Sequence, residues 1–166
     1  MVEIRPERPE DFSGIRQVHE LAFGQADEAH LVDALRAAGD HVPELCLVAL
    51  AEGEIVGHIL FSEARLDTGS AVLTLAPMGV RPARQRQGVG SALIREGLGR
   101  AAATDFPLVV VVGHADYYPR FGFERGKDHG IVCPFRVPPE SWMVHLLPAY
   151  RPEVRGKVEY PRAFGL

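Results

Sequence analysis

The first forty residues show apolar positions in two different periods. Residues 2–5 alternate and predict a short strand. A helix is predicted from about Pro9, because proline suits the first helical turn and apolar residues then recur every three or four positions up to Ala22. The same spacing returns from about Asp27, and Gly39 is typical of a helix end. The chain therefore begins with a strand and two amphipathic helices.

Three β-rich runs follow, at Leu45–Ala51, Ile55–Arg65 and Ala71–Val80. Short polar turns with glycine separate these runs, which predicts an antiparallel meander. Residues 88–103 have the pattern of a helix, and the run Leu108–Val112 is almost wholly β-branched, as in a strand that is covered on both faces. Strand, helix and buried strand in this order predict one parallel crossover.

The fold class predicted is therefore α/β (α+β), with a mixed, mostly antiparallel central sheet flanked by helices and one parallel β-α-β crossover. Residues 142–147 predict a further strand, and the many prolines after residue 133 predict a loop-rich remainder. A length of 166 residues fits a single domain over 1–166. In open sheets of this kind ligands bind at the carboxyl ends of the strands, which directs attention to the segments after Val80 and Val112.

Composition excludes several classes of protein. Hydrophobic residues make up 46% and charged residues 24%, which is ordinary for a soluble globular domain. The longest apolar stretch, residues 106–113, is too short to span a bilayer, and no leader pattern is present, so we expect a cytoplasmic protein without a membrane partner. The two cysteines, Cys46 and Cys133, predict free thiols, and the scattered histidines show no metal-ligand spacing, so no metal site is predicted.

Charge is distributed unevenly along the chain. The formal net charge is −4, which argues against a general nucleic-acid binder. Residues 1–40 carry nine acids against four arginines, whereas residues 81–100 carry five arginines against one glutamate. The acidic front suits a cationic ligand and the basic middle an anionic one, although ordinary surface scatter explains the same pattern.

The segment Val80–Ser91 has the features of a phosphate-binding loop. Gly88 and Gly90 permit close backbone approach, and the helix that starts there directs free N–H groups and its positive dipole end outward. Arg84 and Arg86 add positive charge. Two glycines that merely open a helix are the alternative.

Two motifs in the predicted order of elements resemble those of the GCN5-related N-acetyltransferase (GNAT) family, in a bacterial branch of predicted acetyltransferases. The first is Gln85-Arg86-Gln87-Gly88-Val89-Gly90, after a strand and at a helix start. The second is Tyr118-Pro119-Arg120-Phe121-Gly122-Phe123, after the buried strand. The resemblance covers most of residues 2–147, which are taken as the core, with 148–166 as an extension packed on it.

The resemblance implies that acetyl-coenzyme A (acetyl-CoA) lies in a V-shaped split between the central strands 71–80 and 108–112. Backbone groups of the first strand would hold the pantetheine arm, an N–H near Gly79 or Val80 would stabilise the oxyanion, and amides across residues 86–91 would hold the pyrophosphate. The implied cofactor-binding residues are Met78, Gly79, Val80, Gln85, Arg86, Gln87, Gly88, Val89, Gly90, Ser91, Tyr118 and Phe121.

The chemistry implied is direct attack of an amine on the thioester. Tyr118 matches the motif tyrosine and is the expected general acid for the departing thiolate, the alternative being a packing role in an aromatic cluster. Family members often carry a glutamate on the strand before the first motif, but residues 71–80 contain no acid. Glu28 and His114 are therefore the candidates for the base. Further candidates are Glu63, Asp67 and Asp116, or a chain of water molecules.

The predicted function is transfer of the acetyl group of acetyl-CoA to a primary amine of a small molecule or peptide, by a monomer or a homodimer. The acidic front favours a cationic acceptor, and acids on an exposed helix face are the alternative explanation. A non-catalytic acyl-CoA binding or sensing module and a nucleotide-phosphate binder are the two other functions open to the sequence.

Overall fold

The computed structural model describes residues 2–165, which form two compact units. Unit 1 contains the chain up to Phe61 and Ala76–Arg100, and unit 2 contains Ser62–Leu75 and the chain from Ala101 onward. Two long strands each contribute one part to unit 1 and the other part to unit 2. The prediction that a single domain spans the chain stays a prediction.

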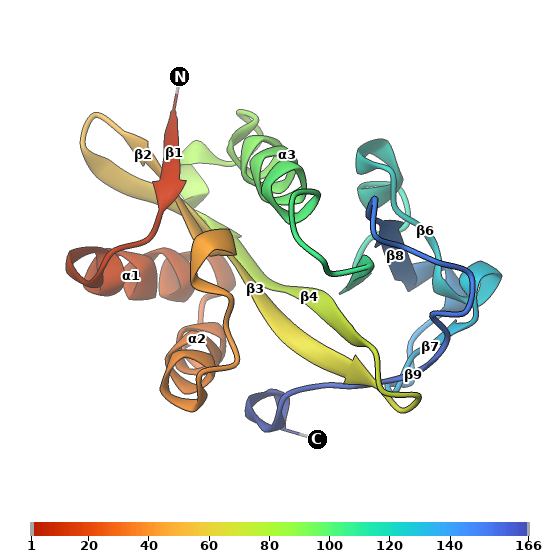
Figure 1. The fold of residues 1–166 in the computed structure, drawn as a ribbon. Coiled ribbons are helices and arrows are strands. Elements are labelled where there is room, and N and C mark those ends of the chain that lie inside the picture. Colours follow the sequence, from red (N-terminus) through yellow and green to blue (C-terminus); the bar gives the residue numbers. More distant parts are fainter. Residues whose placement is uncertain (1, 166) are drawn as a thin grey trace. The chain divides into compact units, whose positions relative to one another are not determined.

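The structure contains three α-helices and nine strands in the described part of the chain (Figure 1). The helices are α1 (Phe12–Phe23), α2 (Asp27–Ala38) and α3 (Val89–Ala101). The strands are β1 (Glu3–Pro6), β2 (Leu47–Ala51), β3 (Glu54–Leu66), β4 (Ala71–Val80), β5 (Leu108–Val112), β6 (Glu124–Arg125), β7 (Ile131–Val132), β8 (Trp142–Leu146) and β9 (Gly156–Glu159).

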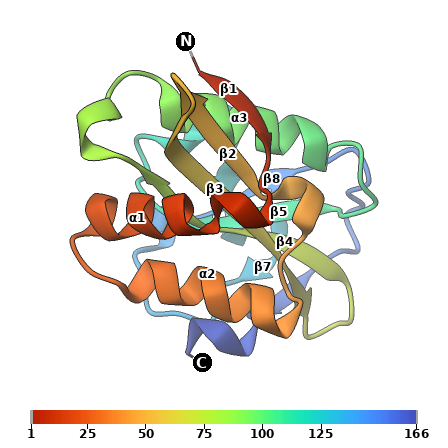
Figure 2. The ribbon, with the colours of Figure 1, turned by 90° about the vertical axis from the view of Figure 1, so that its left-hand side faces the viewer.

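Unit 1 has helices on both faces of its strands. β1 pairs with β2, and β2 with the first part of β3, both antiparallel, with a bulge at Ala49 and Leu50. Helices α1 and α2 lie side by side over one face, and α3 lies behind the strands in Figure 2. The glycines Gly24 and Gly39 end α1 and α2 in the left-handed conformation that glycine adopts without strain.

The first helix begins later than predicted. Pro9–Asp11 is a 3-10 turn, and α1 starts at Phe12. The carboxylate of Asp11 accepts the backbone N–H of Arg8 at 2.8 Å and two bonds from the Arg5 guanidinium at 2.7 and 3.0 Å. These bonds fix the tight turn, and the contribution of Arg5, six residues before Asp11, could not be predicted from periodicity.

Unit 2 contains the predicted parallel crossover strand. The first half of β4 pairs in parallel with β5 at Leu73–Val109, and β5 pairs antiparallel with β8, which pairs with β6. The strand order β1-β2-β3-β4-β5-β8-β6 makes a mixed, mostly antiparallel sheet, so the predicted fold class is confirmed. The V-shaped split remains an expectation from the resemblance.

The loop-rich remainder contributes a strand that was not predicted. β9 pairs antiparallel with β3 at Arg65 and Leu66 and in parallel with β7. Its Val158 is buried in the core of unit 2, with Trp142 and Val144 of β8. The indole N–H of Trp142 donates to the carbonyl of Ile131 at 2.8 Å. Trp142 is therefore a core residue of unit 2.

Candidate active site

The predicted phosphate loop is built by the sequence between β4 and α3. A 3-10 turn at Pro82–Arg84 leads into Arg86 and Gly88, both with positive φ, of +63° and +85°. Helix α3 starts at Val89, and the carbonyl of Gly88 accepts the N–H of Ala92 at 3.0 Å. An α-helix leaves its first N–H groups without intrahelical acceptors, so the amides of this first turn are suited to bind an anion.

Side chains of the loop brace its own backbone. The Gln85 amide donates to the Val80 carbonyl at 3.0 Å, and the Gln87 amide donates to the Ala83 carbonyl at 3.2 Å. Gln85, Arg86, Gln87 and Gly88 are all exposed. The two glutamine side chains therefore stabilise the loop backbone, and the positive potential of the loop comes from its arginines and the helix dipole.

Arg81 anchors the base of the loop. Its guanidinium donates to the Ile55 carbonyl and to the Gln17 side chain, both at 2.7 Å, and its backbone N–H donates to the Val56 carbonyl at 2.8 Å. Arg81 thus ties the end of β4 to β3 and α1. This structural role explains one of the five arginines in the basic stretch without any ligand.

The end of β4 alternates between buried and half-buried positions. Pro77 and Gly79 are buried, whereas Met78 and Val80 are half-buried, and the Ala76–Pro77 peptide bond is cis. Gly79 packs against the ring of His19 on α1, since a Cβ at Gly79 would lie 2.8 Å from the His19 Nδ1. No larger residue fits there without a shift of His19.

Tyr118 starts a 3-10 turn in unit 2 and packs within an aromatic cluster. Its ring meets those of Tyr117 and Phe123 edge-on, with centroids 5.1 and 5.5 Å apart, and Tyr117 meets Phe121 at 5.2 Å. Gly113 leaves the space for the Tyr118 ring. Burial raises the pKa of Tyr118 to about 12, so its hydroxyl keeps its proton at neutral pH. The packing role and a proton-donor role are compatible.

The two residues suggested as bases occupy different units. His114 is exposed, in the turn after β5, and its carbonyl accepts the N–H groups of Tyr117 and Tyr118. Glu28 lies in the first turn of α2, half-buried, and accepts a hydrogen bond from Gln25 at 3.3 Å. Neither side chain has a partner in the described residues that would mark it as a base.

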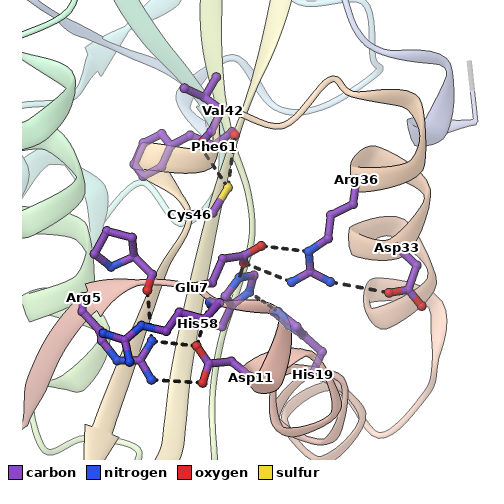
Figure 3. A network of polar contacts seen from close by, with 12 residues as sticks. Arg5, Glu7, Asp11, His19, Asp33, Arg36, Val42, Cys46, His58 and Phe61 are labelled. Carbon is purple, nitrogen blue, oxygen red and sulfur yellow. Dashed lines mark hydrogen bonds and ion pairs between the residues drawn. The ribbon is translucent and has the colours of Figure 1, made fainter.

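A buried polar chain in unit 1 was not predicted (Figure 3). Glu7 accepts two hydrogen bonds from Arg36, at 2.8 and 3.0 Å, and lies 2.7 Å from the Nε2 of His58. The Nδ1 of His58 in turn lies 2.8 Å from the Nε2 of His19. Both histidines are fully buried. His58 is therefore a buried histidine with both ring nitrogens bonded, but its partners are far away in sequence and no spacing motif links them.

The protonation states of this chain follow from burial and charge. Burial is the largest influence on Glu7 and acts upward, but the hydrogen bonds from His58 and Arg36 outweigh it and lower the Glu7 pKa to about 2. Burial lowers the pKa of His58, and it lowers that of His19 to about 3. At neutral pH the chain therefore consists of an ionised carboxylate and two neutral imidazoles.

Ion pairs account for part of the acidic front. Glu7 pairs with Arg36, Asp11 with Arg5, and Asp33 with Arg16, at distances of 2.6 to 2.8 Å. Each of these acids is locally neutralised by an arginine. The excess of acids is thus a weaker argument for a cationic acceptor than the sequence alone indicates.

Three further findings concern metal ligands, membrane spans and cysteines. Within residues 2–165 no group of three or more histidine, cysteine or acidic residues is placed to hold a metal ion. Over the same range, no helix is long and apolar enough to cross a membrane. Cys46 is buried, and burial raises the pKa of its thiol to about 12, whereas Cys133 is half-buried.

Comparison with known proteins identifies the family. Residues 3–126 match the model of the acetyltransferase (GNAT) domain. The chain is 40% identical over 155 residues to the uncharacterized N-acetyltransferase YjhQ of Escherichia coli K12, covering 89% of this chain and 86% of YjhQ. It is 32% identical over 164 residues to the uncharacterized N-acetyltransferase YhbS of the same strain, covering 97% of each.

Solved structures agree with this assignment. The crystal structure of YhbS from E. coli in complex with CoA has a TM-score of 0.91 at 31% identity, covering 99% of this chain and 92% of that one. A GNAT family acetyltransferase from Brucella melitensis, in complex with acetyl-CoA, has a TM-score of 0.82 at 35% identity, covering 99% and 98%. The protein belongs to the GNAT family of N-acetyltransferases, as the two motifs indicated.

Proposed function

We propose that the protein transfers the acetyl group of acetyl-CoA directly to a primary amine of a small molecule or peptide. The observation that carries this proposal is the loop before α3, where positive φ angles at Arg86 and Gly88 present the first-turn amides of a thirteen-residue helix. The two solved relatives bind CoA and acetyl-CoA, respectively. A diphosphate accepts such amide donors, and arginines add charge-assisted bonds.

The cofactor in this proposal runs from the loop along the end of β4. Amides across Arg86–Ser91 hold the pyrophosphate, with Gln85 and Gln87 bracing the loop. Backbone groups of Met78 and Val80 hold the pantetheine arm, and an N–H of Gly79 or Val80 stabilises the oxyanion of the tetrahedral intermediate. The half-buried state of Met78 and Val80 supports this role.

Tyr118 is the general acid in this proposal. The amine attacks the thioester carbon, the C–S bond breaks, and the Tyr118 hydroxyl supplies a proton to the departing thiolate. A pKa of about 12 keeps the Tyr118 hydroxyl protonated, so that it can donate to the departing sulfur. Phe121 follows in the same turn and helps to bind the cofactor. Glu28 and His114 are the proposed bases for the ammonium of the acceptor, to be separated by substitution.

Calorimetry with CoA tests the binding half of the proposal. Gly88→Ala places a side chain at a φ of +85°, whereas Gly69→Ala introduces the same kind of strain at +108° in a turn remote in sequence from the loop. We expect Gly88→Ala to weaken CoA binding at least tenfold and Gly69→Ala to leave it within twofold. Equal weakening in both variants, or no binding to the unmodified protein, would contradict the proposal.

Release of free thiol from acetyl-CoA over a panel of amines tests the catalytic half. We expect Tyr118→Phe to lower kcat about tenfold or more with little change in CoA affinity, since only the hydroxyl is removed. If the kcat of Tyr118→Phe equals that of the unmodified protein at every pH from 6 to 9, Tyr118 has no part in the mechanism. Binding of acetyl-CoA without thiol release under any acceptor would instead favour a non-catalytic acyl-CoA module, and displacement of CoA by ATP would favour a nucleotide-phosphate binder.

A further inference from the structure

The buried chain Glu7–His58–His19 has a defined direction of hydrogen bonding. An ionised carboxylate has no proton to give, so the Nε2 of His58 must donate to Glu7. A neutral imidazole carries one N–H, which leaves the Nδ1 of His58 as an acceptor. The Nε2 of His19 must therefore donate to it across 2.8 Å. Each proton in the chain is fixed by the charge of Glu7.

The hydrogen-bonded row of side chains ends at the Nδ1 of His19, which carries an unprotonated lone pair and lies against β4. Because the single N–H of His19 is used toward His58, its Nδ1 carries no proton. This atom is buried and has no hydrogen-bond partner in the described part of the chain. It faces Gly79, where a Cβ would come within 2.8 Å. A proton on Nδ1 would point at the Gly79 methylene, which cannot accept a hydrogen bond. A buried donor without an acceptor costs free energy, so the proton is disfavoured there.

A role for His19 as the base that deprotonates the acceptor does not fit its environment. An alkyl ammonium has a pKa of about 10, whereas that of His19 is about 3, so proton transfer between them is unfavourable by about seven powers of ten. His19 also has no exposed surface. Glu7, His58 and His19 are therefore better suited to fix the position of neighbouring atoms than to transfer a proton.

We propose that Glu7, His58 and His19 are positioning residues that fix the main chain of β4 at Gly79 for acetyl transfer. The inference rests on the proposed function, in which an N–H of Gly79 or Val80 stabilises the oxyanion. The charge of Glu7 fixes the tautomer of His58, and the hydrogen bond from His19 to His58 then fixes the tautomer of His19. His19 contacts β4 through its unprotonated Nδ1. Arg36, which donates twice to Glu7, keeps the carboxylate ionised.

NMR of the full chain labelled with 15N-histidine tests the tautomers directly, without reference to activity. At pH 7 we expect a protonated Nε2 and a bare Nδ1 for both His19 and His58, and for His19 we expect this state to persist from pH 5 to 9. A protonated Nδ1 on His19, or a His19 midpoint near pH 6.5, would overturn the proposal. Because the reading is taken on the unmodified protein, it stands even where a variant fails to fold.

Kinetics of Glu7→Gln test the consequence for catalysis. We expect kcat to fall about tenfold to a hundredfold, with KM for acetyl-CoA within threefold and no shift of the pH profile. Asp11→Asn is the matched control, since Asp11 is a buried carboxylate that pairs with Arg5 and lies outside the chain. We expect its kcat to stay within twofold.

A purely structural role predicts a different pattern. In that case both variants lose thermal stability while the folded fraction keeps its kcat, which would refute the positioning role. If the unmodified protein acetylates no amine, the proposed function fails, and the 15N spectrum still decides whether the tautomer chain exists.

Discussion

At the scale of single residues, burial of charged and polar groups in unit 1 makes stability depend on pH. Glu7 has a pKa of about 2 in the folded protein against an ordinary value of 4.5, and His19 has about 3 against 6.5. Both pKa values are lower in the folded than in the unfolded chain, so the unfolded chain binds more protons as the pH falls. The contribution of these two groups to the free energy of unfolding is therefore fully present above about pH 6.5 and is lost progressively below it.

The pH ranges of the two groups overlap between about pH 4.5 and 3, but of the two only His19 acts above pH 4.5, so substitutions can separate them. His19→Gln should flatten the loss of stability from pH 6.5 down to about 3, and Glu7→Gln should flatten it between pH 4.5 and about 2, where Glu7 contributes about 3 kcal/mol. Urea unfolding at a series of pH values measures both effects. His30→Gln, which removes an exposed imidazole outside the buried polar chain, is the control in the same measurement. A profile for His19→Gln that matches the unmodified protein would contradict the assignment.

Residue patterns indicated some of the site and not the rest. The loop residues Gln85–Ser91 are consecutive, so their grouping follows from the sequence itself. The contacts of His58 with His19 and Glu7 join positions 39 and 51 residues apart, on different elements. No periodicity relates them, since only the pairing of β1, β2 and β3 and the docking of α1 bring these side chains together.

At the scale of elements, two glycines of α3 have opposite roles. Gly97 lies against the ring of Phe61 on β3, with room for no side chain, whereas nothing lies within 4 Å of a Cβ at Gly99. Gly97→Ala should destabilise the protein by about 1–3 kcal/mol through overpacking. Gly99→Ala should stabilise it by about 0.5–1 kcal/mol, because alanine favours the helix. Denaturant midpoints of the two variants, measured side by side, check the docking of α3. Stabilisation by Gly97→Ala would show that α3 does not pack closely on β3.

Strong local signals explain which elements were predicted well. β4 has the predicted bounds, 71–80, and α2 ends before Gly39 as expected, because turns and a C-terminal glycine mark them locally. β6, β7 and β9 are two to four residues long and too short to show a period. They form because partner strands and the core of unit 2 hold them, which is information that the local sequence does not contain.

At the scale of the whole molecule, unit 2 depends on residues late in the chain. Val158 of β9 is 1% exposed and belongs to the same core as Trp142 and Leu108, although its neighbours in sequence are polar. Val158→Ala should therefore lower the free energy of unfolding by about 2 kcal/mol. Lys157→Ala, on the exposed side of the same strand, should change it by less than about 0.5 kcal/mol.

Chemical denaturation of both variants checks this prediction. Equal, small effects would mean that β9 contributes little to the core of unit 2. A loss confined to Val158→Ala would show that the extension after residue 147 is part of the folded structure that carries Tyr118, and that shortening the chain there would affect the second motif.

The buried thiol of Cys46 offers a way to observe unit 1 opening. It lies 3.3 Å from the Val42 carbonyl, and its raised pKa of about 12 leaves almost no thiolate in the native state. A maleimide dye should consequently label Cys133 first, and the much slower reaction at Cys46 would time the local opening events of unit 1. The natural cysteines thus provide a labelling site for a fluorophore at Cys133 and a probe of the rate of local opening at Cys46, without any substitution.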